Sequence, residues 1–146
     1  KYYTYASDPT KTFVAPAPKD EVPFIDFSPL QNALAKLKTS AESYQQLVDA
    51  NRNLSASTLH QLNVLLFQSE RKLMLDNGLP NRPWYKHSIY APGYYTGYGV
   101  KTMPAIREAI ESYKWQEAQQ QITETTKAIE AYVINLDAAV ALLKGN

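Results

Sequence analysis

The C-terminal part of the chain carries a long amphipathic pattern, and this pattern constrains the fold more than any other feature. From Trp115 to about Leu143 the residues of one helical face recur every three or four positions. The stripe consists of Trp115, Ala118, Ile122, Thr125 or Thr126, Ile129, Val133, Leu136, Val140 and Leu143. A helix over these 29 residues is about 43 Å long. It suits a bundle that spans the whole domain.

Two further helices are predicted in the first half of the chain. Ser28-Pro29-Leu30-Gln31 reads as a capping box with proline at the first helical position, and the helix it opens ends near Ala50. Its apolar face is Leu30, Ala33, Leu37, Ala41, Tyr44 and Leu47 or Val48. The next helix starts near Ser55 or Ser57 and ends at Asp76-Asn77-Gly78. Because the link between them is short, we expect these two helices to pack antiparallel.

The apolar face of the second helix consists of Leu59, Leu62, Leu65 or Leu66, Ser69 or Glu70, and Leu73. A third, shorter helix follows Thr102, its expected cap, with the sequence MPAIREAIESY. Four amphipathic segments with few glycines predict an all-α fold, a four-helix bundle with a long Gly/Tyr/Pro-rich loop between helices 2 and 3. Residues 1–26 contain four prolines and no glycine, so we expect an extended arm or linker before a helical domain over 27–146.

The loop at 78–104, GLPNRPWYKHSIYAPGYYTGYGVKTMP, differs from the rest of the chain. It holds four of the five glycines, four of the nine prolines and five of the eleven tyrosines. Long loops inside compact domains are uncommon, and most are either functional or disordered. The aromatic content argues against disorder. This loop is therefore the first place to look for function.

The totals exclude several classes of function. A formal net charge of +1 gives no strong field for nucleic acid or an acidic membrane, and no apolar run approaches the length of a membrane span. The absence of cysteine removes disulfides, thiolate metal sites and a cysteine nucleophile. His60 and His87 are the only histidines and are 27 positions apart, too few for a self-contained zinc centre. No phosphate-binding loop or G-x-S-x-G nucleophile motif is present.

Charged and aromatic residues of the loop have two readings each. Arg82, Lys86, His87 and Lys101 are either a basic patch for an anion or structural groups. We favour the structural alternative, in which Arg82 pairs with a buried carboxylate or carbonyl and organises the loop. Glu108 and Glu111 read as solvated helix charges. Tyr94, Tyr95 and Tyr98 lie among three glycines and cannot all point inward, so at least one is expected to face a partner or ligand.

The loop also carries a family resemblance. The stretch GLPNRPWYKHSIYAP at 78–92, then Tyr98 and Met103-Pro104-Ala105-Ile106, resembles the transferrin-receptor-like dimerisation domain. That domain closes the chain of glutamate carboxypeptidase II and related zinc peptidases of the M28 family. The resemblance covers about residues 25–143 and includes the loop-organising positions. These are Arg82, Trp84, Tyr85, His87, Tyr90 and Pro92.

The resemblance implies a helical domain that helps to form a homodimer and completes a substrate pocket of a neighbouring catalytic domain. Zinc and its ligands would belong to that catalytic domain, so this fragment would hold no cofactor and be inactive in isolation. The pocket loop would comprise Tyr94, Tyr95, Gly97 and Tyr98. Relatives place a Lys-Tyr pair on the glutamate side chain of the substrate. Here Tyr98 matches the tyrosine, whereas Gly97 stands at the lysine position, which argues against a preference for C-terminal glutamate.

Three alternatives stay open. The parent is either such a peptidase or a non-catalytic, transferrin-receptor-like protein in which this domain serves assembly or partner binding. A third reading is an independent helical module whose tyrosine loop holds a glycan or peptide. The resemblance implies an extracellular or periplasmic location, which the sequence itself leaves open. The apolar faces of helices 1 and 4 predict an exposed patch that drives dimerisation.

Overall fold

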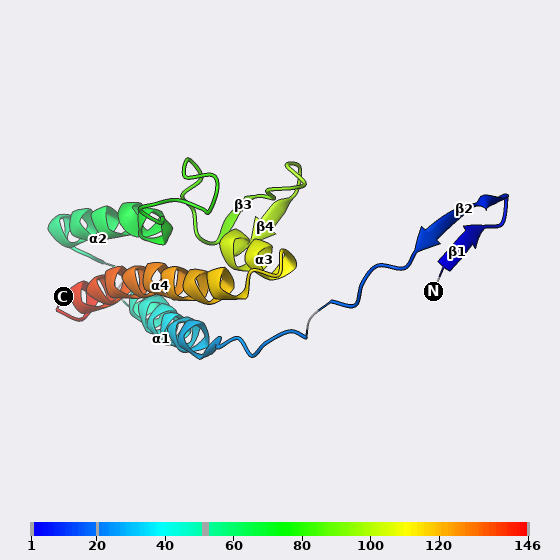
Figure 1. Cartoon of the computed structure of the whole chain (residues 1–146). Coiled ribbons are helices and arrows are strands. Elements are labelled where there is room, and N and C mark those ends of the chain that lie inside the picture. Colours follow the sequence, from blue (N-terminus) through cyan, green and yellow to red (C-terminus); the bar gives the residue numbers. More distant parts are fainter. Residues whose placement is uncertain (1, 20, 51–52, 146) are drawn as a thin grey trace.

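The computed structural model describes residues 2–19, 21–50 and 53–145 (Figure 1). Its helices are α1 (Ser28–Ala50), α2 (Ala56–Ser69), the short 3-10 helix η1 (Glu70–Leu73), α3 (Pro104–Glu111) and α4 (Trp115–Lys144). Two antiparallel hairpins pair β1 (Tyr2–Tyr5) with β2 (Asp8–Val14) and β3 (Tyr90–Pro92) with β4 (Val100–Thr102). The predicted helical class is confirmed in that four α-helices form the body of the molecule. The two small sheets were not predicted.

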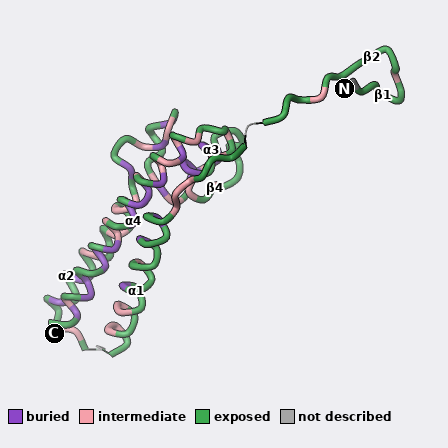
Figure 2. Tube along the Cα trace, turned by 60° about the horizontal axis from the view of Figure 1, so that its bottom comes forward, coloured by how far each residue is buried: buried purple, intermediate pink, exposed green. Residues whose placement is uncertain are grey.

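Helix α4 is the central element. It contacts α1, α2, η1 and α3, and Figure 1 shows it running between α1 and α2. The predicted stripe is buried from Ala118 to Leu143, whereas Trp115 is half-buried. Adjacent pairs such as Ala128/Ile129 and Ala139/Val140 are both buried, so the covered face is wide enough for two helices. Figure 2 shows these buried positions along the length of α4.

This arrangement corrects the prediction that α1 and α2 pack on each other. Across the described ranges, both helices lie against α4, and their backbones do not approach one another. The fold is therefore three helices on one long helix rather than a closed four-helix bundle. Near α3 the core joins Leu30 and Ala33 of α1, Ile106 of α3, and Ile122, Ile129 and Val133 of α4. At the other end Leu62 of α2 packs with Ala139 and Leu143.

The starts of two helices differ from the prediction. Helix α1 is already helical at Ser28, and its free N–H is bound by Asp26, whose Oδ1 accepts from the Ser28 amide at 2.9 Å. Hydrogen bonding to Ser28 lowers the pKa of the Asp26 carboxyl. Helix α3 begins after Met103, which has φ 47°, while the expected cap Thr102 is the last residue of β4. By contrast, Ser55 caps α2 as predicted, accepting from the Thr58 amide at 3.0 Å.

The end of α2 also differs. The helical pattern was expected to continue to Asp76, but the chain leaves the helix at Met74, which is extended. Main-chain bonds to the following loop explain the change, because Leu75 N–H binds Lys86 O at 2.8 Å and Ser88 N–H binds Leu73 O at 2.9 Å. Within α2, Leu62 is buried as expected, but Leu59 is 47% exposed.

The N-terminal arm is only partly the extended segment that its prolines predict. Its first described residues form the β1–β2 hairpin, whose side chains from Pro9 onward are exposed. The described residues between Val14 and Ser28, which are 15–19 and 21–27, form no regular element (Figure 1). Apolar packing of Ile25 and several hydrogen bonds fasten the arm to the helical body. Lys19 Nζ donates to Tyr113 Oη at 2.7 Å, and Gln119 exchanges two hydrogen bonds with the backbone of Asp26.

Candidate functional site

The segment between η1 and α3 begins with a compact series of turns. Leu79 N–H binds Tyr85 O at 2.8 Å, Arg82 N–H binds Leu79 O at 3.1 Å, and Tyr85 N–H binds Arg82 O at 3.0 Å. Gly78 has φ 68°, and a Cβ at this position would lie 2.2 Å from the carbonyl oxygen of Pro83. Only glycine fits there. The glycine and prolines of GLPNRP therefore build a rigid base for the rest of the loop.

Arg82 lies at the centre of this base and is 3% exposed. Its Nη2 donates to both carboxylate oxygens of Glu108 on α3, at 2.7 and 2.8 Å. Its Nη1 donates to the carbonyl oxygen of Pro92 at the end of β3. Glu108 Oε1 also accepts from the Tyr94 amide at 2.8 Å. One buried ion pair thus ties the turn, the exit of β3 and α3 together.

The other three members of the suggested basic patch also have partners within the chain. Lys86 Nζ donates to the Asp76 carbonyl at 3.1 Å, and Lys101 binds the Glu111 carboxylate. The hydrogen bond from Lys101 is the largest cause that lowers the pKa of Glu111. His87 lies 3.0 Å from Glu70 and belongs to a separate network. The arrangement is that of structural pairs rather than a free anion site.

The His87 network fixes the orientation of β3. The Nδ1 atom of His87 accepts from the amides of Ile89 and Tyr90, at 3.2 and 3.3 Å, so its Nε2–H is the atom that donates to Glu70. The Tyr90 hydroxyl donates to the same Glu70 oxygen at 2.8 Å, which raises the pKa of Tyr90. The rings of His87 and Tyr90 stack at 4.0 Å between centroids. Trp84, in contrast, is 72% exposed and takes no part.

The tip of the loop lies between β3 and β4 and presents its aromatic side chains outward. Gly93 N–H binds Gly99 O at 3.0 Å and Gly97 N–H binds Gly93 O at 2.8 Å, which closes a tight turn. Gly97 has φ 62°, and no atom lies within 4 Å of a Cβ built there. Tyr98 is fully exposed and Tyr95 is 74% exposed. The backbone of the tip is therefore fixed by hydrogen bonds, while the side chains of Tyr95 and Tyr98 are largely exposed to solvent.

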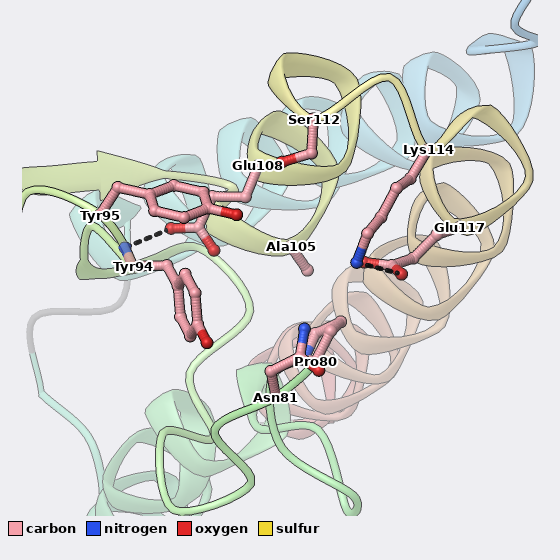
Figure 3. Close-up of a pocket in the computed structure, with 9 residues that line it drawn as sticks. All are labelled: Pro80, Asn81, Tyr94, Tyr95, Ala105, Glu108, Ser112, Lys114 and Glu117. Atoms are coloured by element: carbon pink, nitrogen blue, oxygen red, sulfur yellow. Dashed lines mark hydrogen bonds and ion pairs between the residues drawn. The ribbon is translucent and has the colours of Figure 1, made fainter.

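A small hollow lies beneath the tip (Figure 3). Its volume is about 20 Å³, and it is lined by Tyr94 and Tyr95, by Pro80 and Asn81 of the turn, and by residues of α3 and α4. In Figure 3 the Glu108 carboxylate reaches the Tyr94 amide on one side, while Lys114 and Glu117 pair on the other. A space of this size holds about one water molecule. The hollow by itself is too small to hold a peptide side chain.

Within the described ranges, no three His, Asp or Glu side chains lie close enough to hold a metal ion. His60 is exposed on α2, and His87 is engaged with Glu70 and the backbone. The residues present therefore do not fit a zinc centre. No helix in the described part of the chain is both long and apolar enough to cross a membrane.

Sequence reasoning missed two carboxylates of the site. Glu108 was read as a solvated charge, but its side chain is only 13% exposed and it accepts from Arg82 and Tyr94. Glu70 was considered only as part of an apolar helix face, yet it joins His87 to Tyr90. A signal did exist for Glu108, because it lies one turn after the buried Pro104 and Ala105 on a short amphipathic helix.

Comparison with known proteins identifies the family of this chain and two relatives. The transferrin receptor-like dimerisation domain matches residues 25–137. A probable glutamate carboxypeptidase of Arabidopsis thaliana, LAMP1, is 36% identical over 112 residues, which cover 72% of this chain and 16% of that protein. A probable glutamate carboxypeptidase of Arthroderma benhamiae is 29% identical over 124 residues, covering 84% of this chain and 17% of the relative.

The chain thus spans about one sixth of the length of these relatives. The match begins at residue 25, just before α1, and runs through the Arg82 base, the tyrosine tip, α3 and most of α4. The resemblance carried by GLPNRPWYKHSIYAP is confirmed by this match. The chain belongs to the transferrin receptor-like dimerisation domain family.

Proposed function

We propose that this domain assembles a homodimer and completes the substrate pocket of a zinc-dependent exopeptidase of the glutamate carboxypeptidase type. The observation that carries the proposal is the contrast between the rigid base of the loop and the solvent-exposed tyrosines at its tip. Arg82 and Glu108 fix the backbone from Pro92 to Tyr94, while Tyr98 is fully exposed and Tyr95 is 74% exposed at the edge of the small hollow. The relatives are named as carboxypeptidases, which favours a peptidase over a receptor-like parent.

Catalysis would then belong to the rest of the parent protein. The described residues offer no metal-ligand group, and the hollow under the tip holds about 20 Å³. The domain's own contribution is positional, because a hydroxyl or ring held on a fixed backbone orients a bound substrate. We expect the isolated domain to hydrolyse no peptide.

The tip would set which substrate side chain is accepted. Gly97 carries no ammonium group to pair with a carboxylate, whereas Tyr98 offers a hydroxyl and Tyr95 an aromatic ring. A pocket wall of this kind favours an apolar or aromatic C-terminal residue over glutamate, since a buried carboxylate without a cationic partner is unfavourable. No atom lies within 4 Å of a Cβ built on Gly97, but its φ of 62° lies in the left-handed region, so Gly97→Lys also carries about 1–2 kcal/mol of backbone strain.

The experiment is a kinetic comparison on the full-length parent enzyme, with N-acyl dipeptides ending in Glu, Leu or Phe. Tyr98→Ala should lower kcat/KM about tenfold or more, and Gly97→Lys should shift preference toward C-terminal Glu by a similar factor. Ile134→Ala, on an exposed part of α4, is the matched control and should change neither. Unchanged kinetics in both tip variants would contradict the pocket role, and a parent without hydrolytic activity would favour the receptor-like alternative.

Self-association has a candidate surface. A trough of about 590 Å³ runs between α1 and α2, with α4 as its floor. One wall of the trough consists of Leu34, Leu37 and Tyr44 of α1. The opposite wall consists of Leu66 of α2 and Leu73 of η1. The floor consists of Ile129, Tyr132 and Leu136 of α4. Leu34 and Leu66 are each about 40% exposed, so the trough leaves apolar surface uncovered in a single copy. A second copy of this domain is the occupant that the family description favours.

Light-scattering mass across a concentration series tests this surface. The isolated domain should approach twice its monomer mass as concentration rises, and Leu66→Glu should hold it as a monomer, because a charge in the trough opposes burial. Leu59→Glu, at an exposed position on the same helix outside the trough, is the control and should leave the dimer intact. A constant monomer mass for the unmodified domain would show that the trough does not drive association.

A further inference from the structure

The connection between α1 and α2 contains a feature that the proposed function does not use. Asn53-Leu54-Ser55 has the form Asn-X-Ser with X other than proline, the acceptor sequence for N-linked glycosylation. It occurs once in the 146 residues, since none of the other seven asparagines has Ser or Thr two positions later. We propose that Asn53 carries an N-linked glycan in the mature parent protein.

The three residues of the motif have distinct structural roles. Asn53 is exposed in a bend, whereas Leu54 is half-buried and packs on the cluster of Leu62, Ala139 and Leu143. Ser55 is extended, at φ −61° and ψ 154°, and its Oγ caps α2. Leu54 and Ser55 therefore anchor the motif to the helical body and leave Asn53 facing solvent. A bulky, hydrated substituent on the Asn53 amide displaces no packed group.

The position of the motif suits a glycan. The N-terminal end of α2, which directly follows Ser55, and the β3–β4 tip lie at opposite ends of the helical body (Figures 1 and 2). None of the residues that line the trough belongs to the connection. A glycan on Asn53 would therefore leave both the pocket loop and the proposed dimer surface accessible. It would also mark this end as one that faces solvent rather than another protein.

The modification requires a donor from outside the chain. A polyprenyl-diphosphate-linked oligosaccharide in the lumen of the secretory pathway supplies the sugar. The Asn53 Nδ2 forms a bond to C1 of the first sugar as the C1–O bond to the diphosphate breaks. The amide loses one proton, and the lipid diphosphate leaves. The two relatives come from a plant and a fungus, organisms that possess this pathway.

The test uses the full-length protein isolated from its own cells or secreted by a eukaryotic host. The denatured protein is first treated with peptide-N-glycosidase in water labelled with oxygen-18, because this enzyme does not release a glycan from an N-terminal asparagine. It is then digested with trypsin in ordinary water. Cleavage after Arg52 and Arg71 gives one peptide that contains both Asn53 and the exposed Asn63. We expect Asn53 to be converted to labelled Asp while Asn63 stays unlabelled. Unlabelled Asn53 in the mature protein overturns the proposal.

Variants separate the motif from the fold. Asn53→Gln should remove the glycan and its mass shift on a gel, whereas Ser55→Thr keeps both the acceptor sequence and a residue able to cap α2. Asn63→Gln is the matched control, since it changes an exposed asparagine outside any acceptor sequence. Retention of the full mass shift in Asn53→Gln would contradict the assignment. Kinetics play no part in this readout, so it is independent of the pocket proposal.

Discussion

Helix α4 and the segment between η1 and α3 are held in opposite ways. Helix α4 packs through apolar side chains, with Ile122 and Ile129 almost completely buried among residues of α1 and α3. The loop segment contributes few large apolar groups and is fastened by an ion pair, a histidine–carboxylate bond and main-chain turns. Apolar burial is strong but non-directional, whereas hydrogen bonds fix distances and angles.

This difference separates stability from positioning. The helices can repack slightly without losing the domain, because any well-filled core contributes similar free energy. The loop cannot shift without breaking bonds of defined length. A domain that presents a side chain to a neighbouring domain needs both kinds of support, and here they lie in different parts of the chain.

The largest effect on folding is expected from the apolar region. Ile122→Ala should lower the free energy of unfolding by about 2–5 kcal/mol, because it leaves a cavity at a position with no exposed surface. Urea unfolding followed by circular dichroism measures the change. Ile134→Ala on the same helix, at 70% exposure, should change it by less than about 0.5 kcal/mol. Equal effects at both positions would show that α4 is not packed as described.

A smaller effect is expected from the loop. Arg82→Ala should lower the free energy of unfolding by about 1–3 kcal/mol, since it leaves the Glu108 carboxylate and the Pro92 carbonyl without their donor. Part of the loss is offset because Glu108 keeps the Tyr94 amide. The same urea titration measures it, and hydrogen exchange at Tyr94 should rise by a larger factor than exchange in α4.

Arg107 provides the control for that comparison. It lies on α3 beside Glu108 but is 59% exposed and pairs with Glu111, so Arg107→Ala should cost less than about 1 kcal/mol. If Arg82→Ala left both the melting temperature and the exchange at Tyr94 unchanged, the ion pair would not position the loop. The contrast between the two regions would then fail.

The helical half of the fold could be read from sequence because its signals are local. The spacing of Ala118, Ile122 and Ile129 depends only on the period of an α-helix, and Ser55 caps its own helix. The packing of α1 and α2 on α4 could not be read in this way. Three helices with apolar faces can pair in several orders, and loop length alone favoured the wrong one.

The site was harder to predict because its partners are distant in sequence. Arg82 and Glu108 are 26 residues apart, and Glu70 and Tyr90 are 20 apart, so no local pattern joins them. The early end of α2 has the same origin, since the loop residues Lys86 and Ser88 bind the backbone at Leu73 and Leu75. The motif GLPNRPWYKHSIYAP identified the family but not these contacts. The contacts emerge only when the chain is folded.

The unoccupied space around the loop tip has a consequence for how such a domain changes over evolutionary time. The Tyr98 side chain is fully exposed and supports no packing, so substitutions at position 98 carry little risk of unfolding the domain. Most proteins lie near a stability threshold, which limits the mutations they tolerate. Because an exposed side chain at the tip contributes little to stability, many different residues are tolerated there. Selectivity for one substrate or another could then diverge between relatives while the scaffold stays the same.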